Sequence, residues 1–122
     1  MDVLVVEDEA LVRAIVAEDL ADDGLAVAEA TSAESALALT DTAGAPDVVV
    51  TDVNLGRGGM DGLALAEEVR RRWPEAGVVI MTGNPAYVAD RTFGPQERFL
   101  SKPFGARRLV SAVRELLGRS AR

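Results

Sequence analysis

Five short apolar runs recur along the sequence, separated by longer stretches in which apolar residues have helical spacing. The runs cover residues 3–6, 25–28, 48–50, 78–81 and 99–100. Those at 48–50 and 78–81 are apolar at every position instead of alternating, as strands that are covered on both faces require. The pattern therefore predicts a parallel sheet that lies between two layers of helices.

The stretches between the runs predict the helices. Their apolar positions are Leu11, Ile15 and Leu20 in the first stretch, Leu37 in the second, Leu63, Leu65, Ala66 and Val69 in the third, and Leu109, Val110, Val113, Leu116 and Leu117 in the last, which ends near Gly118. Strands and helices thus alternate. Because such crossovers are right-handed, we expect an α/β fold with a single doubly wound five-stranded parallel sheet. Ligands of these folds bind beyond the C-terminal ends of the strands, where the strand order reverses.

The segment in which a fourth helix is expected fits this pattern poorly. Residues 84–98 include Pro85, Gly94 and Pro95 and have no clear apolar stripe. Proline lacks a backbone N–H and breaks a helix interior, and glycine favours turns. We therefore expect this segment to be short and irregular, or mobile.

Length and composition narrow the class of protein. A chain of 122 residues is long enough for one domain, which we expect to span residues 1–122. No apolar run reaches the length of a membrane span, and no signal-peptide pattern is visible, so we expect a cytoplasmic protein with no membrane partner. The chain has no cysteine and no histidine. This excludes thiolate and histidine metal sites, a Ser-His-Asp triad, and a phosphorylated histidine within the chain.

Charge is distributed unevenly along the chain. The net charge is −7, with 14 acidic and 2 basic residues in 1–61 but 6 acidic and 11 basic residues in 62–122. An acidic chain lacks the basic surface that displaces counterions from nucleic-acid phosphates, so we expect no direct nucleic-acid binding. The acidic excess falls where the first three strands are expected.

Acidic and polar side chains follow the predicted strands at the edge where ligands bind. Strand one ends in Glu7-Asp8-Glu9, strand three in Thr51-Asp52, strand four in Thr82-Gly83-Asn84, and strand five in Ser101-Lys102-Pro103. Carboxylates from two strands would crowd one crevice and repel one another unless a cation joins them. Because only oxygen ligands are available, Mg²⁺ or Mn²⁺ fits best.

Lys102 is the only lysine, whereas the other twelve basic residues are arginine. A compact ammonium suits a single oxyanion better than a planar guanidinium does. Pro103 follows directly, which makes a cis peptide plausible there. Asp8 or Thr82 alone would more often be a turn or cap residue, and Asp52 alone is as easily structural as functional. The functional interpretation depends on their occurrence in order at successive strand ends.

The motifs VLVVEDE, VVVTDVNL, MDGLAL, VVIMTGN and FLSKPF occur in order along the chain. Together they resemble the receiver domain of bacterial two-component response regulators, over nearly the whole sequence. The resemblance implies a flavodoxin-like (βα)5 receiver architecture. It also implies that Asp52 is the residue that becomes phosphorylated.

The same resemblance implies a role for each strand-end residue. Asp8 and Asp52 would coordinate the metal with the backbone carbonyl of Asn54, and Glu7 would act largely through a metal-bound water. Lys102 would pair with a phosphate oxygen.

Three further roles follow from the resemblance. Thr82 would move to bond another phosphate oxygen, and Phe99 would be the aromatic switch residue. Asn54 and Asn84, two residues after Asp52 and Thr82, would tune the lifetime of the phosphate.

The resemblance further implies a phosphoacceptor switch instead of an enzyme, with at most weak self-phosphorylation and autodephosphorylation. Its phosphoryl donor would be a histidine kinase or a histidine phosphotransfer protein, and its downstream partner protein is unknown. The face built from the fourth helix, fifth strand and fifth helix could also form a homodimer. The chain could act alone or be part of a hybrid kinase or longer regulator.

Three other functions remain open at this point. A phosphatase of the haloacid-dehalogenase type also uses an aspartate nucleophile with Mg²⁺, but it needs a second aspartate two residues on, where this chain has Asn54. A flavin-binding protein would need aromatic rings for stacking, and Tyr87 and Trp73 are the only candidates. A pseudo-receiver would keep the acidic cluster without using phosphate.

Overall fold

The computed structural model describes residues 1–56 and 58–120, except for the side chains of 119 and 120. Its strands are β1 Val3–Val6, β2 Val27–Ala30, β3 Val48–Asp52, β4 Gly77–Thr82 and β5 Glu97–Ser101, all parallel in the order β2-β1-β3-β4-β5. The helices are α1 Ala10–Asp22, α2 Ala33–Ala43, α3 Gly62–Arg72 and α4 Ala106–Ser120, and η1 Pro85–Val88 is a 3₁₀ turn. The predicted doubly wound five-stranded parallel sheet is confirmed.

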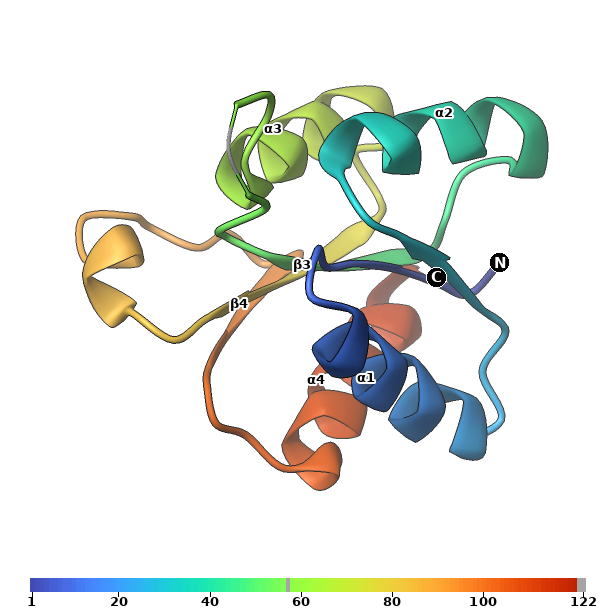
Figure 1. Cartoon of the computed structure of the whole chain (residues 1–122). Coiled ribbons are helices and arrows are strands. Elements are labelled where there is room, and N and C mark those ends of the chain that lie inside the picture. Colours follow the sequence, from blue (N-terminus) through green and yellow to red (C-terminus); the bar gives the residue numbers. More distant parts are fainter. Residues whose placement is uncertain (57, 121–122) are drawn as a thin grey trace.

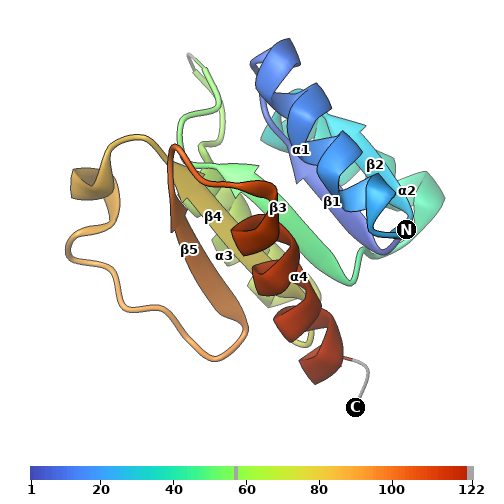
Figure 2. The same ribbon diagram turned by 90° about the horizontal axis from the view of Figure 1, so that it is seen from below.

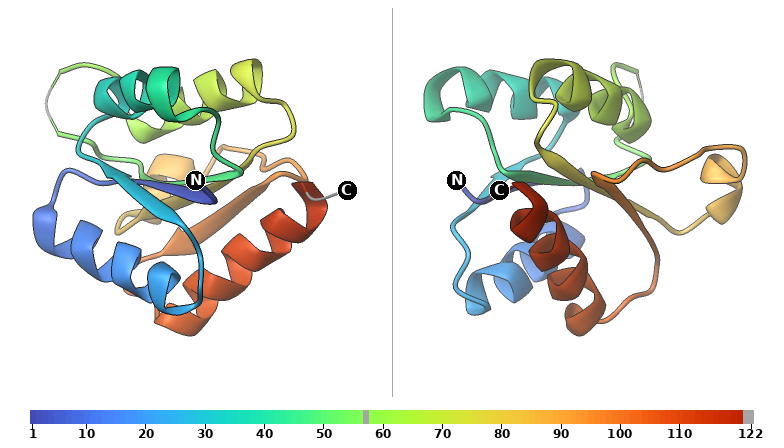
Figure 3. Two further views of the ribbon diagram at one scale, coloured as in Figure 1. Left: turned by 90° about the vertical axis from the view of Figure 1, so that its right-hand side faces the viewer. Right: turned by 180° about the vertical axis from the view of Figure 1, so that it is seen from behind.

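The sheet lies between two helical layers, with α2 and α3 on one face and α1 and α4 on the other (Figures 1 and 3). Alternate residues of β1 enter the two cores: Leu4 and Val6 pack on the α2–α3 side, and Val3 and Val5 on the α1–α4 side. All four are at most 2% exposed. Continuously apolar strands are therefore explained by burial on both faces.

The strand order places the switch point between β1 and β3. The chain leaves β1 toward β2 on one side and returns to β3 on the other. Val6 is opposite Thr51 in the register, so the residues that follow them, Glu7 and Asp52, emerge side by side. The topology thus gathers at one edge the acids that lie 45 positions apart in sequence.

Local sequence sets where the helices begin. The hydroxyl of Ser32 accepts a hydrogen bond from the backbone N–H of Ser35 at 3.0 Å and caps α2. The carboxylate of Asp61 accepts from the N–H of Ala64 at 2.8 Å and caps α3. Such caps satisfy backbone donors that have no partner inside the helix.

The first turn of α3 lies directly against the end of β3 at Gly62. The Gly62 N–H donates to the Val53 carbonyl at 2.8 Å. A Cβ at this position would lie 1.9 Å from the carbonyl oxygen of Asp52. Only glycine therefore lets α3 pack this closely behind the strand end that carries Asp52.

The predicted apolar stripe of the first helix is wrong in part. Leu20 is buried, but Leu11 and Ile15 are 69% and 52% exposed. Successive residues of a helix turn by about 100°, so Leu11, nine positions before Leu20, lies on the opposite side. The buried face instead contains Val16 and Ala17 with Leu20.

The expected fourth helix is reduced to η1, as the prolines predict. From η1 the chain bows outward and returns as β5 (Figure 2). Two strand boundaries differ from the predicted runs. The second strand begins two residues later, at Val27, and the fifth begins at Glu97, a charged residue that no apolar pattern could mark.

Within the described part of the chain, every helix is too short or too polar to span a membrane.

Candidate functional site

Three carboxylates meet at the C-terminal edge of β1 and β3. One oxygen from each of Glu7, Asp8 and Asp52 lies within 4.8 Å of the others. Glu7 is 1% exposed and Asp52 is 8% exposed, whereas Asp8 faces solvent. The predicted crowding of strand-end acids at one crevice is confirmed.

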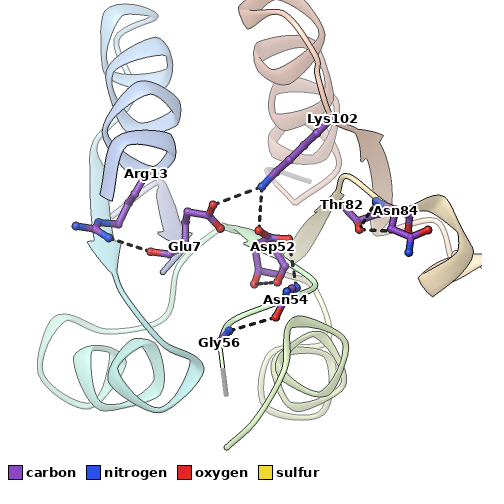
Figure 4. A network of polar contacts seen from close by, with 9 residues as sticks. Glu7, Arg13, Asp52, Asn54, Gly56, Thr82, Asn84 and Lys102 are labelled. Atoms are coloured by element: carbon purple, nitrogen blue, oxygen red, sulfur yellow. Dashed lines mark hydrogen bonds and ion pairs between the residues drawn. The ribbon is translucent and has the colours of Figure 1, made fainter. Parts of the chain in front are cut away.

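Lys102 supplies the positive charge in this cluster (Figure 4). Its Nζ donates to Oδ2 of Asp52 at 2.9 Å and to Oε1 of Glu7 at 3.4 Å. The Lys102 backbone N–H also donates to the Thr82 carbonyl at 2.8 Å, which fixes the residue to the end of β4. The Lys102–Pro103 peptide is cis, as the sequence suggested.

The site changes the ionisation of its buried groups. Burial, together with the nearby Asp52 carboxylate, raises the pKa of Glu7 from 4.5 to about 8, although Lys102 partly offsets this. Burial by itself would lower the pKa of Lys102, but the carboxylates of Asp52 and Glu7 outweigh that effect and raise it. The buried position beside Asp52 therefore favours the protonated form of Glu7 in the metal-free protein.

The geometry fits a divalent cation. Oε2 of Glu7 is buried, and among the described residues it has no hydrogen-bond partner. A buried carboxylate oxygen without a donor is costly, and a hard cation satisfies it. Glu7, Asp8 and Asp52 together offer the all-oxygen set that Mg²⁺ or Mn²⁺ binds.

The loop after β3 borders the acids. The Asn54 N–H donates to Oδ1 of Asp52 at 3.2 Å, and the Asn54 side-chain oxygen accepts from the Gly56 N–H at 3.3 Å. Gly56 has a φ of +89°, and a Cβ there would lie 3.3 Å from Oδ2 of Asp8. The loop can therefore approach the acidic cluster closely only with glycine at position 56.

Thr82 and Asn84 occupy the end of β4. Thr82 is 2% exposed, and its hydroxyl accepts from the Asn84 N–H at 3.0 Å. The Asn84 side-chain oxygen accepts from the Ala86 N–H at 3.1 Å and caps η1. This contact commits one side-chain atom of Asn84 to the turn instead of to the acidic cluster.

Phe99 lies in β5 opposite Ile80 of β4. It is partly buried against the core on the α2–α3 side, and its ring stacks on that of Phe93. Because Thr82 is two residues after Ile80, its side chain and that of Phe99 lie on the same face of the sheet.

Two contacts near the site were not predicted from sequence. The Arg13 guanidinium donates to the Glu7 carbonyl at 2.9 Å, and the carboxylate of Glu34 accepts from the Met60 N–H at 2.8 Å, which ties the loop after β3 to α2. Arg13 is one of two basic residues in the acidic half of the chain. That scarcity is the only sequence signal that could have marked it, and Glu34 had none.

A family model for the response regulator receiver domain matches residues 3–114. The chain belongs to this receiver family. The resemblance seen in its motifs is therefore confirmed, and two-component signalling is the process in which such domains act. Trp73, one of the two aromatic candidates for stacking on a flavin, is half-buried and packs against the core on the α2–α3 side.

Curated relatives and solved structures agree with this assignment. The transcriptional regulatory protein FixJ of Azorhizobium caulinodans is 38% identical over 99% of this chain, and sensor kinase CckA of Brucella abortus is 36% identical over 96%. The receiver domain of NtrX from Brucella abortus has a TM-score of 0.85 at 35% identity, covering 96% of this chain and 98% of that one.

The receiver spans only part of these curated relatives. It covers 57% of FixJ and 12% of CckA. These relatives include both a transcriptional regulatory protein and a sensor kinase, so whole-protein activities differ among relatives that share this domain.

Proposed function

We propose that this chain is a phosphorylation-dependent switch in a two-component phosphorelay, with Asp52 as the residue that accepts the phosphoryl group. The donor would be a histidine kinase or a histidine phosphotransfer protein. The observation that carries the proposal is the Asp52 carboxylate, 2.9 Å from Nζ of Lys102 and within the cluster of Glu7 and Asp8. Membership of the receiver family supports it.

In the transfer step, an oxygen of the Asp52 carboxylate attacks phosphorus, the P–N bond to the donor histidine breaks, and the imidazole leaves with the electron pair. Asp8, Asp52 and the backbone carbonyl of Asn54 would hold Mg²⁺, with Glu7 acting through a bound water. When bound, the ion would neutralise charge on the phosphoryl oxygens. Lys102 would pair with one of these oxygens. Positioning and charge neutralisation are the main demands of phosphoryl transfer.

Phosphorylation would act on the fold through Thr82 and Phe99. The Thr82 hydroxyl would leave the Asn84 backbone for a phosphate oxygen, and Phe99 would turn into the space that it vacates. Both side chains lie on one face of the sheet, which supports this coupling. The phosphate thus biases an equilibrium between two states.

The domain would have only weak chemical activity of its own, namely self-phosphorylation from small donors and autodephosphorylation. Asn54 and Asn84 would tune the lifetime of the phosphate. Asn54 lies next to the acceptor, since its backbone N–H donates to Oδ1 of Asp52. We also propose that residues 1–122 form one cytoplasmic domain that does not bind nucleic acid or membranes directly.

The exposed apolar face of α1 suits the phosphoryl donor. Leu11 and Ile15 face solvent on a helix that begins two residues after Asp8, so they flank the acceptor site. Replacing Leu11 with serine is expected to slow phosphotransfer from a phosphohistidine protein about tenfold, because apolar contact area is lost. Labelling by acetyl phosphate should not change.

Phosphotransfer and acetyl phosphate labelling, measured side by side, check this role. Ala38→Ser, at an exposed position of α2 on the opposite face of the sheet, is the control. Equal phosphotransfer rates for wild type and Leu11→Ser would refute donor docking on α1.

The output surface would be built from η1, β5 and α4. A surface depression between β5 and α4 is lined by Arg98, Phe99, Leu100, Arg107, Arg108, Ser111, Ala112 and Glu115. Its arginines and apolar floor suit an acidic partner protein. A second copy of the chain is the alternative occupant of this face.

Incubation with acetyl phosphate and Mg²⁺, followed by intact mass measurement, tests the proposed function. We expect wild type to gain one phosphoryl group and Asp52→Ala to gain none. Chelation of the metal should prevent the gain in wild type. If the wild-type protein gains no mass, the proposal is refuted and the pseudo-receiver alternative remains.

A further inference from the structure

The segment 89–96, between η1 and β5, occupies the place where the sequence predicted a fourth helix. One arginine in it joins three parts of the molecule. Nη2 of Arg91 contacts Oε2 of Glu97 in β5 at 2.9 Å, and Nη1 contacts Oε1 of Glu67 in α3 at 3.4 Å. The Arg91 guanidinium also lies 5.8 Å from the centre of the Phe93 ring, within range of a cation–π contact.

Glu97 anchors this arrangement from inside the protein. Its side chain is 3% exposed and also contacts Arg70 of α3 at 2.5 Å, while the Gly94 N–H donates to it at 3.0 Å. Burial would raise the pKa of Glu97, but Gly94, Arg91 and Arg70 outweigh that effect and lower it. Removing any one of these partners leaves the buried charge of Glu97 less well compensated and destabilises the fold.

The anchor and the proposed switch residue share one side of β5. Phe99 is two residues after Glu97, so both side chains leave the strand in the same direction. The Phe93 ring stacks on Phe99 with centroids 5.8 Å apart and an interplanar angle of 12°. Through Phe93, the segment fastened by Arg91 thus touches Phe99 directly.

We propose that residues 89–96 form a latch, fastened by Arg91 to Glu97, which holds Phe99 in its unphosphorylated position through the ring of Phe93. The inference rests on the proposed function, because it takes Phe99 as the switch residue. In this proposal a turn of Phe99 toward Thr82 would separate the two rings, so the stack would stabilise the resting state. Arg91 and Phe93 are therefore positioning residues that set the balance between the two states.

The latch predicts a gain of reactivity when it is weakened. The proposal takes the reactive state, like the phosphorylated one, to have Phe99 turned. Phe93→Ala is therefore expected to accept phosphate from acetyl phosphate about twofold to tenfold faster than wild type. Phe93→Tyr keeps the stacked ring and should restore the wild-type rate. Arg91→Gln should also react faster, whereas Arg114→Gln, which breaks the remote ion pair with Asp23, should not.

Initial rates of labelling by acetyl phosphate, measured by intact mass at saturating Mg²⁺, test the latch. A general loss of stability cannot accelerate a reaction that needs the folded site, so faster labelling of Phe93→Ala with rescue by Phe93→Tyr supports the latch. Labelling of Phe93→Ala at or below the wild-type rate would overturn the latch and leave the proposed function intact. Absence of labelling in wild type would overturn both. Phe93→Ala leaves Glu97 paired, so the test does not depend on Arg91→Gln folding.

Discussion

Replacing Glu7 with glutamine is expected to raise the free energy of unfolding of the metal-free protein by about 2–5 kcal/mol near pH 9. The pKa of Glu7 is about 8 in the folded protein, against 4.5 ordinarily. Below pH 4.5 both the folded and the unfolded states hold the proton. As the pH rises from 4.5 to about 8, the unfolded state releases a proton that the folded state keeps, so stability falls; above 8 the folded state carries a second charge beside Asp52 and the loss is complete. Glutamine never acquires that charge.

Urea denaturation between pH 5 and pH 9, without metal, checks this prediction. The difference in stability between Glu7→Gln and wild type should grow over this range, whereas the exposed neighbour Glu9→Gln should follow wild type. Adding Mg²⁺ should stabilise wild type more than Glu7→Gln, because the ion resolves the repulsion that the variant lacks. A pH-independent difference would contradict the account of the acidic cluster.

Replacing Lys102 with alanine is expected to separate phosphorylation from its structural consequence. The variant keeps Asp52 and the metal ligands, so it should still gain a phosphoryl group. It loses the ammonium that contacts Asp52 but keeps the backbone N–H of residue 102, which donates to the Thr82 carbonyl at the end of β4. The side-chain link between Asp52 and the end of β4 is therefore broken. We therefore expect the response of Thr82 and Phe99 to disappear.

Hydrogen exchange of peptides that cover residues 84–101 measures that response. In wild type, phosphorylation should change exchange in this region several-fold, because the segment and β5 rearrange. In Lys102→Ala, phosphorylated to the same extent, exchange should stay at the unphosphorylated level. A full response in this variant would show that Lys102 does not couple the phosphate to the switch.

The sequence predicted the sheet and the strand-end cluster because both follow from short-range patterns. Continuously apolar runs indicate buried parallel strands, and a parallel sheet brings its C-terminal ends to one edge whatever the details of the helices. Glu7, Asp8, Asp52 and Lys102 could therefore be grouped before any contact was known.

The remaining features depend on packing that local sequence does not encode. Helical spacing sets Leu11 and Leu20 on opposite sides of α1, and only the packing of the helix on the sheet decides which side is buried. Glu97 has the charge of a surface residue, and in the folded protein its buried carboxylate is paired with Arg91, six positions earlier, and with Arg70 in α3. The prolines predicted that no regular fourth helix would form. They did not indicate the ion pairs of Arg91 that hold the segment after η1 against α3 and β5.

The central claim is that phosphate is attached to Asp52, and chemical localisation tests it most directly. Borohydride reduces an aspartyl phosphate to homoserine, so the modified residue can be read by tandem mass spectrometry after digestion. The protein labelled by acetyl phosphate should carry homoserine at position 52, and unlabelled protein should retain aspartate there. Homoserine at another acidic position, with Asp52 unchanged, would contradict the account.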